Sequence, residues 1–327
     1  MRQVLTLAVD AGEDGVRLDR WFRRRWPYLS QGQVQKLLRS GQVRVDGGRA
    51  KADQRLAAGS QIRVPPLPDE PTKEEKAELD PRDIAFAKSL VLYEDNEVLA
   101  LNKPSGLAVQ GGTKTRNHVD RLLSAWGEGL TRPRLVHRLD RDTSGVLVLG
   151  KTPGAAAKLA GAFARRRAEK TYWAIVAGFP KPGEGTINLP LAKRGMGERE
   201  QMVPAERKDE DAEAAQTDFA TISRAGPRAA WMALRPHTGR THQLRAHMKA
   251  MGHPILGDPK YFNDASKALS EGLALQLHAR QLILPHPSGG QLVLEAPLSK
   301  ELKVGFAKFG FDEHEAVAEP FKGKPRR

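Results

Sequence analysis

Residues 134–152 read Arg-Leu-Val-His-Arg-Leu-Asp-Arg-Asp-Thr-Ser-Gly-Val-Leu-Val-Leu-Gly-Lys-Thr, which sets Asp140 between Arg138 and Arg141. Positive charges this close favour the ionised carboxyl group, so we expect a carboxylate that can act as a nucleophile at neutral pH. Turn residues at 142–145 and apolar residues at 146–149 predict a tight turn before a buried strand, with Asp140 at the rim of a sheet. The alternative is a structural ion pair at the start of a strand, which is the commoner origin of an Asp-Arg cluster.

Several other segments carry patterns that occur together in one enzyme family. The string His137–Gly145 resembles the central motif of the RluA/RluC/RluD family of RNA pseudouridine synthases, in which the aspartate of Arg-Leu-Asp is catalytic. Further similar segments are 101–109 (Leu-Asn-Lys-Pro-Ser-Gly-Leu-Ala-Val), 170–174 (Lys-Thr-Tyr-Trp-Ala), 237–247 (His-Thr-Gly-Arg-Thr-His-Gln-Leu-Arg-Ala-His), 253–258 and 275–279. They follow one another in family order from about residue 90 to about residue 300.

The resemblance implies the residues of an active site. The catalytic set is Asp140, Tyr172 and Arg245: Asp140 attacks the sugar C1′ or the ring, or abstracts a sugar proton, and the sequence leaves these routes open. Tyr172 stacks on the base or handles the C5 proton, and Arg245 pairs with Asp140. The implied substrate-binding residues are Arg138, His137, Leu244 against the base, Arg240 on a phosphate, Asn102 and Lys103.

Three histidines in one segment raise the question of a metal. His242, His247 and His253 are separated by five and six residues, which turns successive imidazoles off a single helix face, and the chain has no cysteine. A helix beginning near Thr241, with Leu244 and Met248 buried, explains the segment better. We therefore predict no metal site, and the isomerisation implied by the resemblance needs no cofactor.

Composition is consistent with a nucleic acid partner. The 327 residues include 53 Lys and Arg against 39 Asp and Glu, a net charge of +14 that favours binding to a polyanion. The absence of cysteine excludes disulfides, and no apolar run approaches the roughly 18 residues that a membrane helix needs. The first residues lack the apolar core of a signal peptide, so we expect a soluble, cytoplasmic protein without a membrane partner.

The positive charge is concentrated near the N-terminus. Residues 17–64 contain twelve basic and three acidic residues, two short amphipathic helical patterns and a hairpin signal at Asp46–Gly48. This unit resembles an S4 RNA-binding domain, and the resemblance implies phosphate contacts that give affinity without reading sequence. The implied contacts are Arg23, Arg24, Arg25, Lys36, Arg39 and Arg44, and a solvated basic face is the alternative.

These observations predict an α+β protein with an S4-like αβ module at 13–64, a linker at 65–86, a catalytic domain at 87–312 and a basic, disordered tail at 313–327. The catalytic domain should contain a mixed or antiparallel sheet. The highly charged segment 194–215 has almost no aliphatic residues, so we expect it to be poorly ordered.

Within the family, residues 105–112 and Arg141 are similar to RluC, although Phe262 stands where glycine is usual. The implied partner is 23S ribosomal RNA, free or in large-subunit assembly intermediates, with target uridines in the peptidyl-transferase region, and we expect a monomer. Three alternatives stay open: an RluD-type enzyme for other 23S uridines, a non-catalytic S4 RNA chaperone, and a carboxylate hydrolase. For the hydrolase we find neither a partner acid nor a Gly-x-Ser-x-Gly segment.

Overall fold

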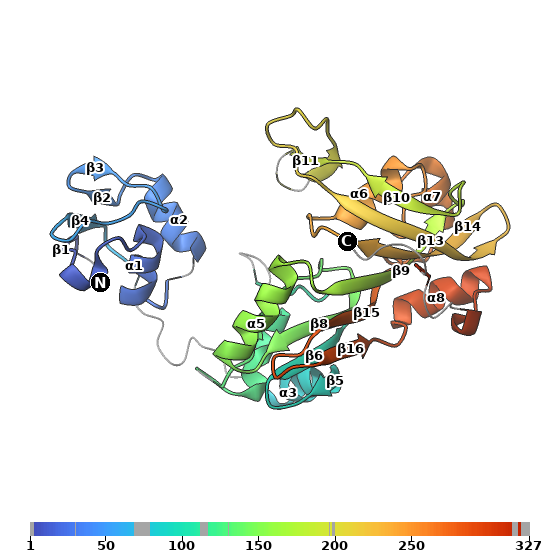
Figure 1. Ribbon diagram of the computed structural model, residues 1–327, viewed down its shortest axis with the longest axis horizontal. Helices are drawn as coiled ribbons and strands as arrows, with labels where there is room; N and C mark the ends of the chain where they lie inside the picture. The colour runs from blue at the N-terminus through green and yellow to red at the C-terminus, as the bar shows by residue number, and fades with distance from the viewer. Residues whose placement is uncertain are drawn as a thin grey trace. The chain divides into compact units, whose positions relative to one another are not determined.

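The structure is a computed structural model that describes residues 3–29, 31–68, 79–111, 117–129, 131–195, 197, 200–315 and 320–321. The chain forms two compact units, Met1–Glu78 and Leu79–Arg327 (Figure 1). No described helix is long and apolar enough to cross a membrane.

The N-terminal unit packs two helices on a small antiparallel sheet. Helices α1 (Leu18–Arg25) and α2 (Gln31–Arg39) and the hairpin of β2 (Arg44–Val45) and β3 (Gly48–Arg49) lie where the sequence predicts them. The sheet has the order β1-β4-β2-β3, with β1 at Leu5–Ala8 and β4 at Gln61–Val64, and the 3-10 helix η1 spans Ala11–Glu13. Leu18, Trp21 and Phe22 are fully buried because residues three and four apart share one face of α1.

The second unit is built on a mixed sheet. Its ten described strands run in the order β10-β13-β14-β9-β15-β8-β6-β5, with β16 beside β15 and β7 beside β8. All pairings are antiparallel except that of β15 with β8. The strands are β5 (Val91–Glu94), β6 (Val98–Lys103), β7 (Arg134–Leu135), β8 (Ser144–Gly150), β9 (Glu169–Ala177), β10 (Glu184–Asn188), β13 (Gln216–Ala225), β14 (Ala229–Pro236), β15 (Leu277–Pro285) and β16 (Gln291–Glu295).

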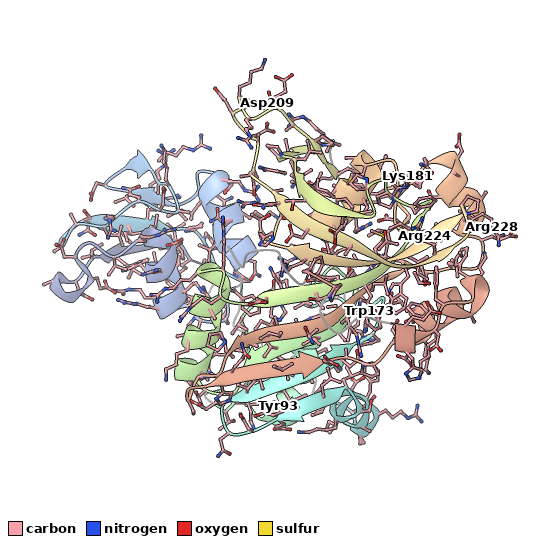
Figure 2. The ribbon with its side chains drawn as sticks, turned by 45° about the vertical axis from the view of Figure 1, so that its right-hand side comes forward. Tyr93, Trp173, Lys181, Asp209, Arg224 and Arg228 are labelled. Atoms are coloured by element: carbon pink, nitrogen blue, oxygen red, sulfur yellow. The ribbon has the colours of Figure 1, made fainter. Side chains whose placement is uncertain are left out.

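Burial follows the sequence pattern of each strand. Every residue of β8 is buried, as expected of a continuous apolar run in the middle of a sheet, whereas β16 alternates between exposed and buried residues. Figure 2 shows Trp173 on β9 within the sheet, where its ring packs edge to face on Trp231 at 4.8 Å. Strand β6 follows Asn96, and β13 pairs with β14 across the turn at Ala225–Arg228.

Helices cover this sheet and connect its strands. They are α3 (Pro81–Ser89), α4 (Val119–Leu122), α5 (Pro153–Ala164), α6 (Gln243–Ala250), α7 (Asp264–Leu269) and α8 (Lys300–Phe309), with short 3-10 helices η2 (Leu123–Trp126) and η4 (Glu313–Glu315). Helix α5 begins where Thr152 accepts a hydrogen bond from the Ala155 N–H and proline occupies the first turn. Its alanine-rich face lets it lie close to the sheet.

The predicted linker is too long at its C-terminal end. The Asp80 carboxylate accepts a hydrogen bond from the Asp83 N–H and starts α3 at Pro81, so residues 81–86 belong to the second unit. Residues 69–78 of the predicted linker lie outside the described residues.

Two predictions of irregular structure also need correction. Strand β12 (Gln201–Pro204) lies inside the charged segment and pairs with β11 (Leu191–Arg194), which ends at the first residue of that segment, and Figure 2 shows Asp209 in the loop that follows β12. In the predicted tail, Phe321 is 8% exposed and packs on Ala220 and Ala233, because a large apolar ring gains more from burial than the chain loses in freedom. Residues 316–319 and 322–327 lie outside the described residues.

Candidate active site

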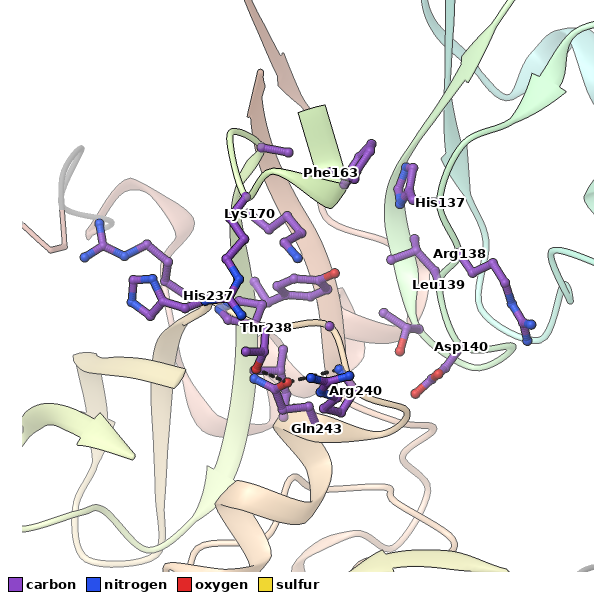
Figure 3. A pocket seen from close by; sticks show the side chains of 18 of the residues that line it. His137, Arg138, Leu139, Asp140, Phe163, Lys170, His237, Thr238, Arg240 and Gln243 are labelled. Atoms are coloured by element: carbon purple, nitrogen blue, oxygen red, sulfur yellow. Dashed lines mark hydrogen bonds between the residues drawn. The ribbon is translucent and has the colours of Figure 1, made fainter. Parts of the chain in front are cut away.

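A pocket of about 780 Å³ lies in the second unit and gathers segments that are far apart in the sequence (Figure 3). Its walls come from the loop before β8, the turn from α5 into β9, the end of β14 with the loop that follows, and the first turn of α6. This arrangement brings Asp140, Tyr172, Leu244 and Arg245 to one cavity. The predicted residues Arg138, His137 and Arg240 also line it.

Lys103 fixes the loop that carries Asp140. The Lys103 ammonium donates hydrogen bonds to the carbonyl oxygens of Arg141 at 2.8 Å, Leu107 at 2.8 Å and Pro104 at 2.9 Å. The side chain is 0% exposed, and this burial lowers the pKa of Lys103 to about 7. The predicted contact of Lys103 with substrate is therefore wrong, because a fully buried amine cannot reach a ligand in the pocket. Its hydrogen bonds stabilise the loop instead. Asn102, its neighbour on β6, also lies outside the pocket.

The positively charged group nearest Asp140 comes from α6, which is far away in the sequence. An Arg245 Nη1 lies 3.5 Å from the Asp140 Oδ2, and the His242 Nε2 lies 3.9 Å from the same oxygen. Arg141 instead pairs with Asp142 at 3.0 Å, and among the described residues neither sequence neighbour forms an ion pair with Asp140. The expectation from local sequence is thus corrected, whereas the resemblance pointed to the residue that lies nearby.

Arg245 is held mainly by a second carboxylate, Asp258. Two hydrogen bonds of 2.7 and 2.8 Å join the Arg245 guanidinium to the two oxygens of Asp258, which is the bidentate geometry that arginine favours. The side chains of Arg245 and Asp258 are 4% and 0% exposed, while that of Asp140 is 29% exposed. The buried guanidinium is therefore neutralised by Asp258, and Asp140 remains open to a ligand.

Tyr261 and His242 complete the surroundings of Arg245. The Tyr261 ring lies 5.0 Å from the guanidinium, and its hydroxyl accepts a hydrogen bond of 2.8 Å from the Met202 N–H of β12. The hydroxyl also lies 3.1 Å from the His242 Nδ1. Burial lowers the pKa of His242, so its imidazole is neutral near pH 7. Strand β12 therefore helps to hold Tyr261, which contacts both Arg245 and His242.

The other two histidines of this segment point elsewhere. His247 is fully buried between the Thr217 hydroxyl and the Leu189 carbonyl oxygen, each 3.0 Å away. The His253 Nδ1 contacts the Ala177 carbonyl oxygen at 2.9 Å. Each imidazole is thus committed to a separate structural contact.

One wall of the pocket is apolar and suited to a planar base. Tyr172 lines it together with Leu244, which is 6% exposed, and Leu277. Burial and the nearby Asp140 raise the pKa of Tyr172, so its phenol is neutral near pH 7. A neutral ring beside leucines offers a stacking surface.

His137 supports this wall more than it offers a polar group. Its ring stacks on Phe163 with 4.4 Å between centroids, and its Nε2 accepts a hydrogen bond of 2.9 Å from the Val148 N–H. Burial lowers the pKa of His137 to about 3, so the ring is uncharged. Arg138, one residue further on, is exposed at the wall of the pocket (Figure 3).

Polar residues shape the opposite rim. The Gln243 side-chain oxygen accepts hydrogen bonds from the Thr238 hydroxyl at 2.6 Å and the Arg240 N–H at 3.1 Å, which fixes the loop before α6 (Figure 3). The Arg240 guanidinium pairs with Glu213 at 2.6 Å. Beside it, the buried Asp218 binds both Arg235 and His237 at 2.8 Å.

Sequence reasoning missed Asp258, Tyr261 and Gln243 as parts of the site. Asp258 and Gln243 stand inside segments that resemble the family, but neither received a role. Asp258 lies thirteen residues beyond Arg245, past the end of α6, where no helical periodicity connects the two. Only the Gly257-Asp258 ending of the segment 253–258 offered a signal.

The predicted phosphate contacts of the N-terminal unit divide into two groups. Arg23, Arg24, Lys36, Arg39 and Arg44 are exposed. Arg25 is different, because its guanidinium lies 3.1 Å from both Asp10 and Glu13 and stacks over the Trp21 ring at 4.7 Å. Arg25 therefore ties α1 to the segment before it, and its assignment as a free phosphate contact is corrected.

Comparisons with known proteins agree on one family. A profile described as RNA pseudouridylate synthase matches residues 97–250. Ribosomal large subunit pseudouridine synthase C of Salmonella typhi and that of Escherichia coli are each 35% identical over 306 residues, covering 92% of this chain and 95% of the relative. An uncharacterized RNA pseudouridine synthase of Synechocystis is 37% identical over 298 residues, covering 87% and 86%. The solved structure of human RNA pseudouridylate synthase domain containing 4 is similar with a TM-score of 0.59 and 28% identity, covering 71% of this chain and 98% of that one.

Proposed function

Because this chain belongs to the RNA pseudouridylate synthase family, we propose that it isomerises uridines of 23S ribosomal RNA to pseudouridine as RluC-type enzymes do. The observation that carries the proposal is the convergence of Asp140, Tyr172 and Arg245 in one pocket of the mixed-sheet unit. Support for the substrate comes from relatives named ribosomal large subunit pseudouridine synthase C, which align with nearly the whole chain.

The target uridine leaves the RNA stack and enters the pocket. A base inside a folded RNA is inaccessible, so a nucleoside must swing out before its glycosidic bond can be reached. Its uracil lies on the Tyr172 ring with Leu244 supporting it, and its sugar faces Asp140. The neutral phenol of Tyr172 favours stacking over proton abstraction as its resting role.

Asp140 acts on this nucleoside without a cofactor. Its carboxylate attacks C1′ or the ring, or removes a sugar proton, while the bond from C1′ to N1 breaks. The uracil then turns within the pocket and C1′ bonds to C5, while the bond to Asp140 breaks or the abstracted sugar proton returns. The C5 proton leaves and N1 gains a proton. Reactants and products have the same atoms, so no oxidant or energy source enters the balance.

Arg245 positions this carboxylate. Its two bonds to Asp258 fix the guanidinium, and the remaining Nη1 meets Asp140 at 3.5 Å. A fixed positive charge holds the carboxylate in place, and the absence of a second strong bond leaves it able to react.

Residues 13–64 act in this proposal as an S4-like module that holds RNA through its phosphates. The exposed Arg23, Arg24, Lys36, Arg39 and Arg44 supply attraction without sequence reading. The module delivers 23S RNA, free or within a large-subunit assembly intermediate, to a monomeric enzyme in the cytoplasm.

The test is tritium release from ribosomal RNA labelled with [5-³H]uridine, because bonding at C5 expels its hydrogen. We expect release from 23S transcripts, followed by pseudouridines that map to the peptidyl-transferase region. Transcripts of 16S RNA and transfer RNA serve as controls. Release from a control RNA alone, or 23S sites only of the RluD type, would overturn the assignment.

A further inference from the structure

Helix α5 ends in an arginine where a glycine is expected. The Arg166 N–H donates to the Phe163 carbonyl oxygen at 3.1 Å, and the Arg167 N–H donates to that of Ala162 at 2.8 Å. These two bonds define a Schellman motif, whose left-handed position is usually glycine because a Cβ crowds the backbone there. Arg166 holds that position with φ of 56°.

Two other helices, α6 and α8, are followed by glycine in the left-handed conformation. After α6, the N–H groups of Gly252 and His253 make the corresponding two bonds, and Gly252 has φ of 83°. Helix α8 is followed by Gly310 with φ of 73°. A strained residue that persists where glycine would relieve it points to a function of its side chain.

Two further described residues other than glycine have a positive φ, and each has a local reason for it that Arg166 lacks. Besides Arg166, the described residues other than glycine with positive φ are Asp46 and His242. Asp46 sits in a hairpin turn, where aspartate tolerates this conformation, and His242 faces the catalytic Asp140. Arg166 has no such local reason, because arginine gains nothing from a left-handed backbone.

The strained turn borders the pocket. Arg166, Arg167 and Lys170 all line it, and Lys170 lies two residues before Tyr172 on β9, hence on the same face of the strand. Arg166 and Arg167 are exposed, and Lys170, labelled in Figure 3, is half-buried. The turn therefore brings three positive charges to the pocket that contains the stacking surface, with the Glu169 carboxylate between Arg167 and Lys170 in the sequence.

These three cations differ from others around the pocket in their partners. Arg235 is paired with Asp218, and Arg240 is paired with Glu213. Within the part of the chain that the structure describes, no carboxylate forms an ion pair with Arg166, Arg167 or Lys170. Three unpaired cations on one turn attract an anion from outside the protein, and arginine binds phosphate oxygens in a fixed fork.

We propose that the turn from Arg166 to Lys170 is a phosphate subsite that binds the RNA backbone next to the target uridine. Arg166 and Arg167 bind phosphate oxygens at the edge of the pocket, and Lys170 binds the phosphate nearest the flipped nucleoside. The inference rests on the proposed function, because it assumes that RNA enters this pocket.

The decisive variant is Arg166→Gly, since it removes the charge while restoring the residue that the backbone prefers. We expect a melting temperature no lower than that of the wild type, a KM for the RNA raised about tenfold and kcat within about twofold. The dependence of log Kd on log salt should flatten by about 0.7 for a lost contact with single-stranded RNA. Arg167→Ala should raise KM and flatten the salt dependence of Kd to a similar extent.

Two matched variants separate the subsite from charge alone. Arg228→Ala removes an exposed arginine on the turn between β13 and β14, outside the pocket lining, and should leave KM and the salt slope unchanged (Figure 2). Arg166→Lys keeps the charge and should restore most of the affinity. An Arg166→Gly enzyme with the KM and salt slope of the wild type would overturn the subsite. If the wild type released no tritium, the proposed function would fail, while filter binding of the same RNA would still decide the subsite.

Discussion

The positive charges of the N-terminal unit and those beneath the catalytic pocket differ in what surrounds them. Arg23, Arg24 and Lys36 are exposed, so their attraction for RNA reaches into solvent and is screened by salt. Arg245 and Lys103 are buried, and they bind a carboxylate and backbone carbonyl oxygens, respectively. Arginine and lysine therefore attract RNA in the N-terminal unit, whereas under the pocket they hold other protein groups in position.

Removing the carboxylate that the buried cations position should have the largest effect. We expect Asp140→Ala to lose about a thousandfold or more in tritium release, because the variant lacks the carboxylate that reacts with the nucleoside in this proposal. RNA affinity should stay within about threefold, since charge attraction is retained. Asp142→Ala, two residues away and paired with Arg141, is the matched control and should keep most activity. Similar losses in both variants would place the effect in the loop and not in the carboxylate.

Removing the carboxylate of Asp258, which binds Arg245, should have the second largest effect. Asp258→Asn leaves a buried guanidinium without its bidentate partner, so we expect a loss of about 3 kcal/mol in the free energy of unfolding. Arg245 should then shift toward Asp140, and kcat should fall about a hundredfold. Chemical denaturation and single-turnover kinetics measure the two effects. The control is Asp95→Asn, because Asp95 also accepts several hydrogen bonds but lies outside the pocket. An unchanged kcat in Asp258→Asn would mean that Asp258 only stabilises the fold.

The buried ammonium should have a smaller effect on catalysis. Lys103→Met removes three hydrogen bonds and leaves their carbonyl oxygens unpaired, so stability should fall by about 2 kcal/mol. The loop of Asp140 should loosen and kcat should drop about tenfold, with KM little changed. Thermal unfolding and steady-state kinetics test both expectations. A raised KM at constant kcat would return Lys103 to the role of a substrate contact.

A pH titration should distinguish buried pairs from exposed charges. Burial opposes ionisation of Asp218, but hydrogen bonds from Thr186, Arg235 and His237 outweigh it and lower the pKa of Asp218 to about 2. A lowered carboxyl pKa stabilises the fold above the unfolded value near 4, and this gain disappears as the pH falls through about 2. The wild type should therefore exceed Asp218→Asn by about 2 kcal/mol at neutral pH, with the difference shrinking in acid. A difference independent of pH would contradict this pairing.

The exposed arginines should have the smallest effect on stability. We expect the double variant Arg23→Ala with Arg24→Ala to change the free energy of unfolding by less than about 0.5 kcal/mol. Its affinity for RNA at low salt should fall, and its salt slope should flatten by about one to two. Arg25→Ala is the contrasting variant, because Arg25 binds Asp10 and Glu13 and should instead destabilise the unit. Equal salt slopes for the double variant and the wild type would speak against phosphate contacts here.

This contrast also explains how far the sequence could lead. Helices α1 and α2 and the hairpin at Asp46 were predictable because apolar spacing and turn residues act over a few positions. The pairing of Arg245 with Asp140 was reached only through family resemblance, since the two residues lie 105 positions apart.

The sequence could not show that Asp142, and not Asp140, binds the Arg141 guanidinium. Local charge pointed to Arg138 and Arg141 as partners of Asp140, but Arg141 bonds to the adjacent Asp142. The roles of Asp258 and Lys103 depend on burial, which arises only when strands from distant parts of the chain come together. The charged segment 194–215 was misjudged for a similar reason, because the Tyr261 hydroxyl, 59 positions away from Met202, helps to order it.

The most direct test of the central claim is a crystal structure of the Asp140→Asn variant bound to an RNA fragment that contains its target uridine. We predict a nucleoside turned out of the RNA, with its uracil on Tyr172 and the substituted side chain at position 140 within contact of C1′ or the ring. A uridine that remains stacked in the RNA, or that binds in the pocket with its sugar turned away from position 140, would contradict the account.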